Sequence, residues 1–156
     1  MKAATLAELK RELNELPTKQ VVELCLRLTK YKKENKELLT YLLFEAHDEQ
    51  QYIRNVQLEI TTQFGEINTD NIYYAKKGIR KVLRMANKFI KYSGNKQTEA
   101  EVLIYYCREL KETGIPVHRY LDLSKLYDRQ LEKIRKAVAT LHEDLQYDYL
   151  KELEGL

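Results

Sequence analysis

Residues 71–98 read NIYYAKKGIRKVLRMANKFIKYSGNKQT and contain eight basic residues but no acidic residue. Apolar residues recur in this stretch at the spacing of a helix face, from Ile72 to Ile90. Ser93-Gly94 follows them, and glycine often stands just beyond the end of a helix. The pattern therefore predicts an amphipathic helix from about residue 69 to residue 92, aliphatic on one side and cationic on the other.

The cationic side of this predicted helix is narrow. Six cations lie within about 60° of one line along the helix when each residue turns the chain by about 100°. They are Lys77, Arg80, Lys81, Arg84, Lys88 and Lys91. Tyr73 and Tyr92 flank them at the two ends. No glutamate is interleaved to form pairs at i,i+4, so the repulsion between these like charges calls for compensation from elsewhere.

The source of that compensation separates three hypotheses. The whole chain has a net charge of +3, while segment 45–70 carries −5 and segment 143–154 carries −4. We expect first a binding or scaffold protein whose basic helix docks an acidic protein partner. The first alternative is a weak, largely non-specific nucleic-acid binder. The second is an oligomeric structural protein whose basic helix is neutralised by its own acidic segments.

Composition favours one all-helical domain. A chain of 156 residues fits a single domain, residues 1–156, and its 44% hydrophobic and 33% charged content suits a globular protein. Five glycines and two prolines are few, and helix interiors tolerate neither residue well. A sheet would require more valine, isoleucine and threonine, and more turns.

Capping signals and apolar periodicity divide the chain into six or seven helices. Residues 5–8 and 98–101 read as capping boxes, and Pro17 ends the first helix. The pattern predicts helices at 6–16, 18–33, 36–46, 48–65, 69–92, 98–113 and from 124 onward. The third and the sixth are apolar on most sides, so we expect both to be central. Short gaps predict successive antiparallel hairpins, in a bundle or a short HEAT-like array.

The C-terminal stretch carries a heptad pattern. Its apolar residues are spaced 4, 3, 4, 3 and 4. They are Tyr127, Leu131, Ile134, Val138, Leu141 and Leu145. Such a seam predicts a long C-terminal helix that packs along a neighbour or across a dimer, and therefore a possible subunit contact.

No catalytic, metal or cofactor motif is found, and we expect a protein that is not an enzyme. His47, His118 and His142 lack metal-ligand spacing, and Cys25 and Cys107 lie in apolar helical runs that predict buried packing thiols. No small-molecule ligand is inferred. The chain shows neither a signal-peptide pattern nor an apolar run of about 18 residues, so we expect a cytoplasmic protein without a membrane span.

Two resemblances are carried by short stretches. TLAELKREL (5–13), LPTK (16–19) and VELCLRL (22–28) together resemble the SAP motif, a DNA-binding helical hairpin, although the glycine-bearing turn of that family is missing here. The early helix pairs also resemble HEAT-type hairpins, which would imply a binding scaffold.

The wider pattern is similar to an uncharacterised bacterial all-helical family. It is carried by LKRELNELP (9–17), KENKELL (33–39), RKVLR (80–84) and KFIKYS (88–93). That family has no assigned activity, so this resemblance implies a fold and no function.

Overall fold

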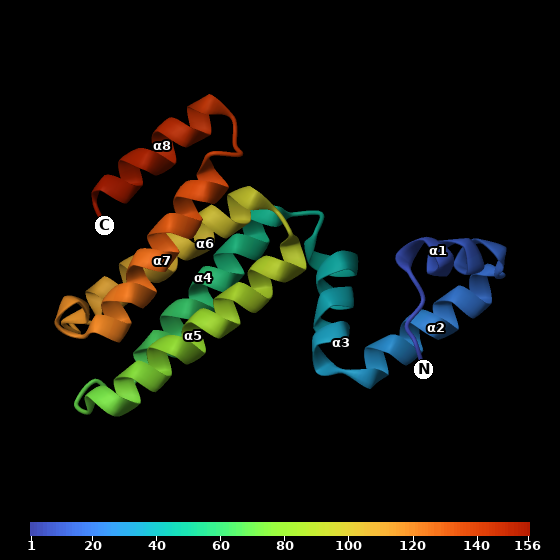
Figure 1. The fold of residues 1–156 in the computed structure, drawn as a ribbon, viewed down its shortest axis with the longest axis horizontal. Helices are drawn as coiled ribbons and strands as arrows, with labels where there is room; N and C mark the ends of the chain where they lie inside the picture. Colours follow the sequence, from blue (N-terminus) through green and yellow to red (C-terminus); the bar gives the residue numbers. More distant parts are fainter. The chain divides into compact units, whose positions relative to one another are not determined.

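The computed structural model describes residues 1–156 and contains helices but no strand (Figure 1). The all-α prediction is confirmed. The helices are α1 (Leu6–Glu15), α2 (Thr18–Tyr31), α3 (Lys33–Thr40), α4 (Glu49–Gly65), α5 (Ile72–Ser93), α6 (Lys96–Glu112), α7 (Leu121–Val138) and α8 (Glu143–Glu154). A π-helical turn, Tyr41–Glu45, follows α3, and a 3-10 turn, Val117–Arg119, precedes α7.

The chain, for which the sequence predicts a single domain, groups into two compact units, residues 1–44 and residues 45–156. We call them the N-terminal unit, which holds α1 to α3, and the C-terminal unit, which holds α4 to α8. They differ in burial. The C-terminal unit contains every buried apolar side chain of the protein except Tyr41.

Helix α6 is the centre of the C-terminal unit, as its apolar sequence predicts. It packs against α4, α5, α7 and α8, and these helices form a bundle around it. Its core side chains are at most 2% exposed; they are Val102, Leu103, Ile104, Tyr106, Cys107 and Leu110. The hydroxyl of Tyr106 donates a 3.0 Å hydrogen bond to the carbonyl of Ile79 on α5, so this buried phenol also links two helices.

The prediction that the third helix is central is wrong. Helix α3 has no buried residue, and Leu42, Leu43 and Phe44 in the turn after it are 56–66% exposed. Apolar periodicity indicates which faces need a partner, but it does not guarantee that the same unit supplies one. Within the N-terminal unit no other element covers these side chains.

The C-terminal heptads do not form one long helix, which corrects a second prediction and raises the number of α-helices to eight. Helix α7 ends at Val138, and α8 begins only after His142. Two local hydrogen bonds favour the break. Thr140 donates its hydroxyl to the carbonyl of Ala137, and the Nδ1 of His142 accepts from the backbone N–H of Asp144 as an N-cap.

Thr98 has a role different from the predicted cap. Helix α6 begins at Lys96 and is capped by Asn95, which leaves Thr98 one turn inside and fully buried. Its hydroxyl donates a 2.5 Å hydrogen bond to Glu49 in the first turn of α4, and Ser93 at the end of α5 donates to the same carboxylate oxygen. This carboxylate therefore joins the ends of three helices.

Gly78 marks a close approach inside α5. A Cβ placed there would lie 2.7 Å from Cγ1 of Ile67, in the loop between α4 and α5. The loop thus packs directly on the helix backbone, which accounts for a glycine in a helix interior despite its unfavourable propensity.

We expect Leu103→Ala to lower the free energy of unfolding by about 2–5 kcal/mol, because it leaves a cavity in a closely packed core. Chemical denaturation followed by circular dichroism measures this. Leu58→Ala is the matched control, since Leu58 on α4 is 67% exposed and its truncation should cost less than about 0.5 kcal/mol. Equal losses in the two variants would contradict the central position of α6.

Candidate functional site

Helix α5 is two-faced, as the sequence predicts. Asn71 caps it through bonds from the backbone N–H groups of Tyr73 and Tyr74, and Gly94 ends it with a φ of 65°. Its buried residues, which face α4 and α6, are Ala75, Ile79, Val82, Ala86 and Ile90. Burial of this apolar face holds the helix in place and directs the opposite face to solvent.

The cations on that opposite face differ in exposure. Lys77, Lys81, Arg84 and Lys91 are exposed, whereas Arg80 and Lys88 are half-buried. None of the four exposed cations has an ion-pair partner. We call Lys77, Lys81, Arg84 and Lys91 the basic ridge.

Asp122, which the sequence reasoning missed, neutralises one end of α5. This residue lies in the first turn of α7, and its carboxylate pairs with Lys76 Nζ at 2.9 Å and with Arg80 Nη2 at 2.6 Å. The hydrogen bond from Lys76, assisted by the one from Arg80, lowers the pKa of Asp122 from its ordinary value of 3.8 to about 2. Neither acidic segment, 45–70 or 143–154, forms an ion pair with the basic ridge.

Aromatic rings accompany the cations of α5. Lys77 Nζ lies 4.6 Å from the centroid of the Tyr73 ring, which is 60% exposed and meets Tyr74 edge-to-face. At the other end of the helix the half-buried Tyr92 packs edge-on against Phe89. The two predicted flanking tyrosines therefore differ, and only Tyr73 offers an open ring.

Of the two contacts predicted for the heptad seam, along a neighbouring helix or across a dimer, the structure shows the first for part of the seam. Tyr127, Ile134 and Val138 are at most 5% exposed because they pack inside the C-terminal unit, where α6 and α7 form the most extensive helix pair. Leu131, Leu141 and Leu145 are half-buried, and the last two lie beyond the end of α7. The three buried side chains are covered by their own chain and are not available to a second subunit.

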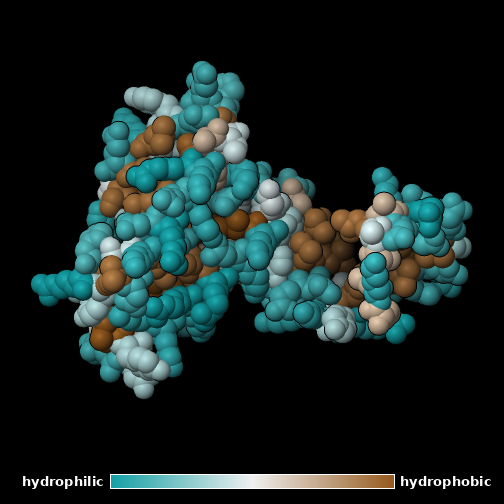
Figure 2. Space-filling model, in the orientation of Figure 1, coloured by the Kyte–Doolittle hydropathy of each residue, from teal (hydrophilic) through white to brown (hydrophobic).

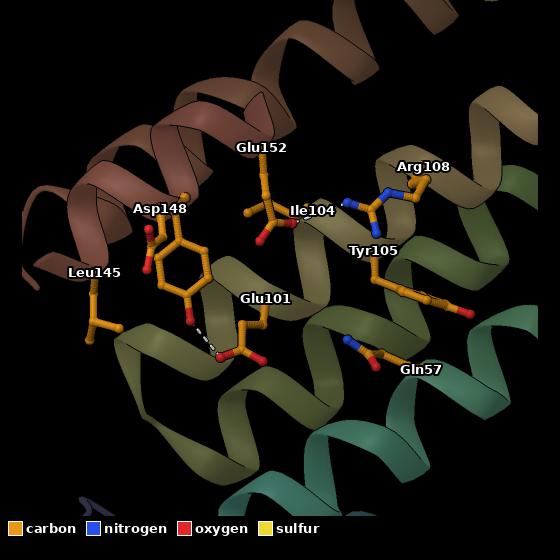
Figure 3. Close-up of a pocket in the computed structure, with 9 residues that line it drawn as sticks. Gln57, Glu101, Ile104, Tyr105, Arg108, Leu145, Asp148 and Glu152 are labelled. Atoms are coloured by element: carbon orange, nitrogen blue, oxygen red, sulfur yellow. Dashed lines mark hydrogen bonds and ion pairs between the residues drawn. The ribbon is translucent and has the colours of Figure 1, made fainter. Parts of the chain in front are cut away.

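A pocket of about 320 Å³ opens between α6 and α8, with Gln57 of α4 at its edge (Figure 3). Tyr149 donates a 2.5 Å hydrogen bond to Glu101, drawn as a dashed line in Figure 3, and Arg108 pairs with Glu152 at 3.1 Å. The other lining residues are Ile104, Tyr105, Leu145 and Asp148.

The wall of this pocket is anionic, with three carboxylates and one guanidinium. Burial, together with the bond to the Glu101 carboxylate, raises the pKa of Tyr149, so its phenol stays protonated and donates. The arrangement would repel an anion and accommodate a small cation. The acid-rich sequence of 143–154 indicates the negative charge of one pocket wall. The pocket itself could not be predicted, because Glu101 and Arg108 on α6 are distant from this segment in sequence.

The two cysteines have different surroundings. Burial raises the pKa of the Cys107 thiol to about 12, so this group is protonated and unreactive, as the packing prediction requires. Cys25 is exposed, which corrects the prediction that it is buried. No group of three or more His, Cys, Asp or Glu side chains is arranged to hold a metal ion.

Comparison with family models, with curated proteins and with solved structures gives no match. Among the helices of the structure, none combines the length and the apolar character needed to cross a membrane.

We expect Asp122→Asn to lower stability at pH 7 and to have a much smaller effect near pH 2. The pKa of Asp122 is lower in the folded chain than in the unfolded chain. The ion pair therefore contributes its full stabilisation above about pH 4, and this stabilisation is lost as the pH falls through about 2. Denaturant midpoints measured from pH 2 to pH 7 test this. Asp128→Asn, exposed on the same helix and without an ion pair, is the control. A pH-independent difference between the variants would contradict the assignment.

Proposed function

We propose that the protein is a non-enzymatic binding protein whose basic ridge on α5 docks an acidic protein surface. The observation that carries the proposal is that Lys77, Lys81, Arg84 and Lys91 are exposed and have no ion-pair partner. A row of uncompensated like charges costs free energy that an acidic partner would recover.

The dimensions of the ridge suit a helix or an extended segment rich in acids. From Lys77 to Lys91 the helix rises by about 21 Å. Because the apolar face of α5 packs against α4 and α6, the backbone that carries these cations is held rigidly. Exposed charges of this kind are screened over about 8 Å at physiological salt. Binding through the ridge should therefore be salt-sensitive and should gain more in association rate than in lifetime.

Arg80 and Lys76 contribute less in this proposal, because Asp122 already pairs with both. Internal neutralisation, the basis of the oligomeric alternative, thus reaches the N-terminal part of α5 but not the ridge. The proposed binding surface is therefore smaller than the predicted one and consists of the four exposed cations of the basic ridge.

Nucleic acid is the second candidate ligand, and one observation favours it. Tyr73 and Tyr74 are 60% and 56% exposed beside Lys77, so unpaired bases could stack on their rings while the ridge contacts phosphates. Such binding would be largely independent of sequence.

We expect Lys81→Glu/Arg84→Glu to weaken binding to polyglutamate at least about tenfold at 50 mM salt, since two attractive contacts become repulsive. Fluorescence anisotropy measures the affinity. Lys125→Glu/Arg129→Glu makes the same charge change on exposed residues of α7 and should bind like the wild-type protein.

Single-stranded DNA of random sequence, titrated in parallel, separates the two candidates. Binding to DNA but not to polyglutamate would favour nucleic acid. Equal losses in the two double variants would show that net charge, not the ridge, determines binding, and no binding of the wild-type protein to either polymer would contradict both candidates.

A further inference from the structure

The N-terminal unit has no core of its own. Helices α1, α2 and α3 contain no buried residue, and Tyr41 is the single buried side chain of residues 1–44. Twelve large apolar residues between Leu6 and Phe44 are 36–85% exposed. Chains of about 40 residues rarely bury enough surface to be stable alone and commonly depend on association with another chain.

Part of this apolar surface forms a groove between α2 and α3. The groove has a volume of about 300 Å³, and its apolar lining consists of Cys25, Leu28, Leu38, Leu39 and Leu42. Asn35 donates a 2.8 Å hydrogen bond to the carbonyl of Leu28, which fixes the two walls relative to each other. Figure 2 shows hydrophobic residues lining a hollow in this unit.

Helix α1 presents a stripe that matches such a groove. Leu6, Leu9, Leu13 and Leu16 follow the spacing 3, 4, 3, which places them along one side of the helix. None of them is buried, and α1 has no extensive packing against α2 or α3. Amphipathic helices with this spacing are the usual occupants of hydrophobic grooves.

The charges beside the stripe and beside the groove are complementary. Glu8 and Glu12 flank one side of the leucine stripe on α1, where Glu8 caps the helix through Thr5 and Glu12 pairs with Arg11, and Lys10 lies on the other side. Four lysines stand at the turn that joins the two walls of the groove, and Glu34 and Glu37 lie beside them; Lys33 pairs with Glu37 at 3.6 Å, which leaves Lys30, Lys32 and Lys36 without an ion pair. An inserted α1 would bring its acidic flank to this basic end.

In the observed geometry α1 does not occupy the groove of its own chain. Only Leu16 and Pro17 separate α1 from α2, and both are extended, with φ/ψ of −86°/146° and −60°/145°. Proline fixes its φ, which restricts how this short linker can rearrange. Within the N-terminal unit the stripe and the groove are therefore both open.

We propose that a second copy of this chain closes both surfaces: α1 of each copy lies in the α2–α3 groove of the other, and a symmetric dimer results. Each copy supplies one stripe and one groove, so two reciprocal contacts satisfy both molecules without leaving an open end.

Sedimentation velocity of the full chain at 50 µM tests the oligomeric state. The wild-type protein is expected at twice its mass of 18.6 kDa. Leu9→Glu/Leu13→Glu removes the stripe, Leu28→Glu/Leu38→Glu removes the groove, and each variant should be monomeric with an unchanged C-terminal core. Leu58→Glu, on an exposed site of α4, should remain dimeric. A monomeric wild-type protein overturns the proposal.

Mixing the two monomeric variants tests the pairing itself. One intact stripe and one intact groove remain in the mixture, so a heterodimer should form again at a higher concentration than the wild-type dimer needs. Absence of any heterodimer would mean that the contact joins like surfaces, stripe to stripe or groove to groove, and would overturn the proposed exchange.

Disulfide cross-linking tests whether α1 of one copy lies in the α2–α3 groove of the other. Leu13→Cys/Cys25→Ser is mixed with a tagged chain that keeps its exposed Cys25, and mild oxidation should give a mixed dimer on a non-reducing gel. Asn14→Cys/Cys25→Ser, about 100° around α1 from Leu13, is the matched control and should not cross-link. Equal cross-linking of both variants, or none with Leu13→Cys/Cys25→Ser, overturns the placement of α1.

Discussion

Burial of α6 by four surrounding helices is the constraint on which the C-terminal unit depends. Because its apolar side chains point in nearly all directions, α6 is stable only when α4, α5, α7 and α8 surround it. The polar contacts between helices serve this arrangement: Tyr106 bonds to α5 and Thr98 bonds to Glu49 of α4. Each satisfies a buried group that would otherwise carry a desolvation cost.

The position of α6 also determines what α5 can do. With its aliphatic face held against α4 and α6, α5 has one rotational setting, and its cations have no freedom to turn toward the acidic segments. Asp122 reaches only the N-terminal end of the helix. The basic ridge is thus a consequence of core packing, and a partner would meet a surface that is already organised.

Helix positions could be predicted from the sequence because periodicity, caps and prolines act locally. The first helix begins after the Thr5–Glu8 capping box and α5 ends at Gly94, as predicted, while α5 begins after Asn71, two residues from the predicted start. The break after α7 is local, but the other failures involve distant partners. The local sequence predicts Thr98 as a helix cap, whereas in the structure its hydroxyl donates a hydrogen bond to Glu49, which is far away in sequence. The heptads of α7 predict a contact along a neighbouring helix or across a dimer, and only the fold shows that α6 covers Tyr127, Ile134 and Val138. The pairing of Asp122 with α5 and of Tyr149 with Glu101 could not be predicted locally, because only the folded bundle brings these partners together.

The absence of a core in the N-terminal unit means that no single free energy of unfolding describes this protein. The C-terminal unit has the buried contacts of a cooperative two-state domain. The order of residues 1–44, in contrast, is linked by mass action to whatever covers their leucines. A change in the concentration of the chain would then change the protection of backbone amides against hydrogen exchange in α1 to α3 but not in α6. Local opening of the N-terminal unit is thus decoupled from global unfolding of the C-terminal unit.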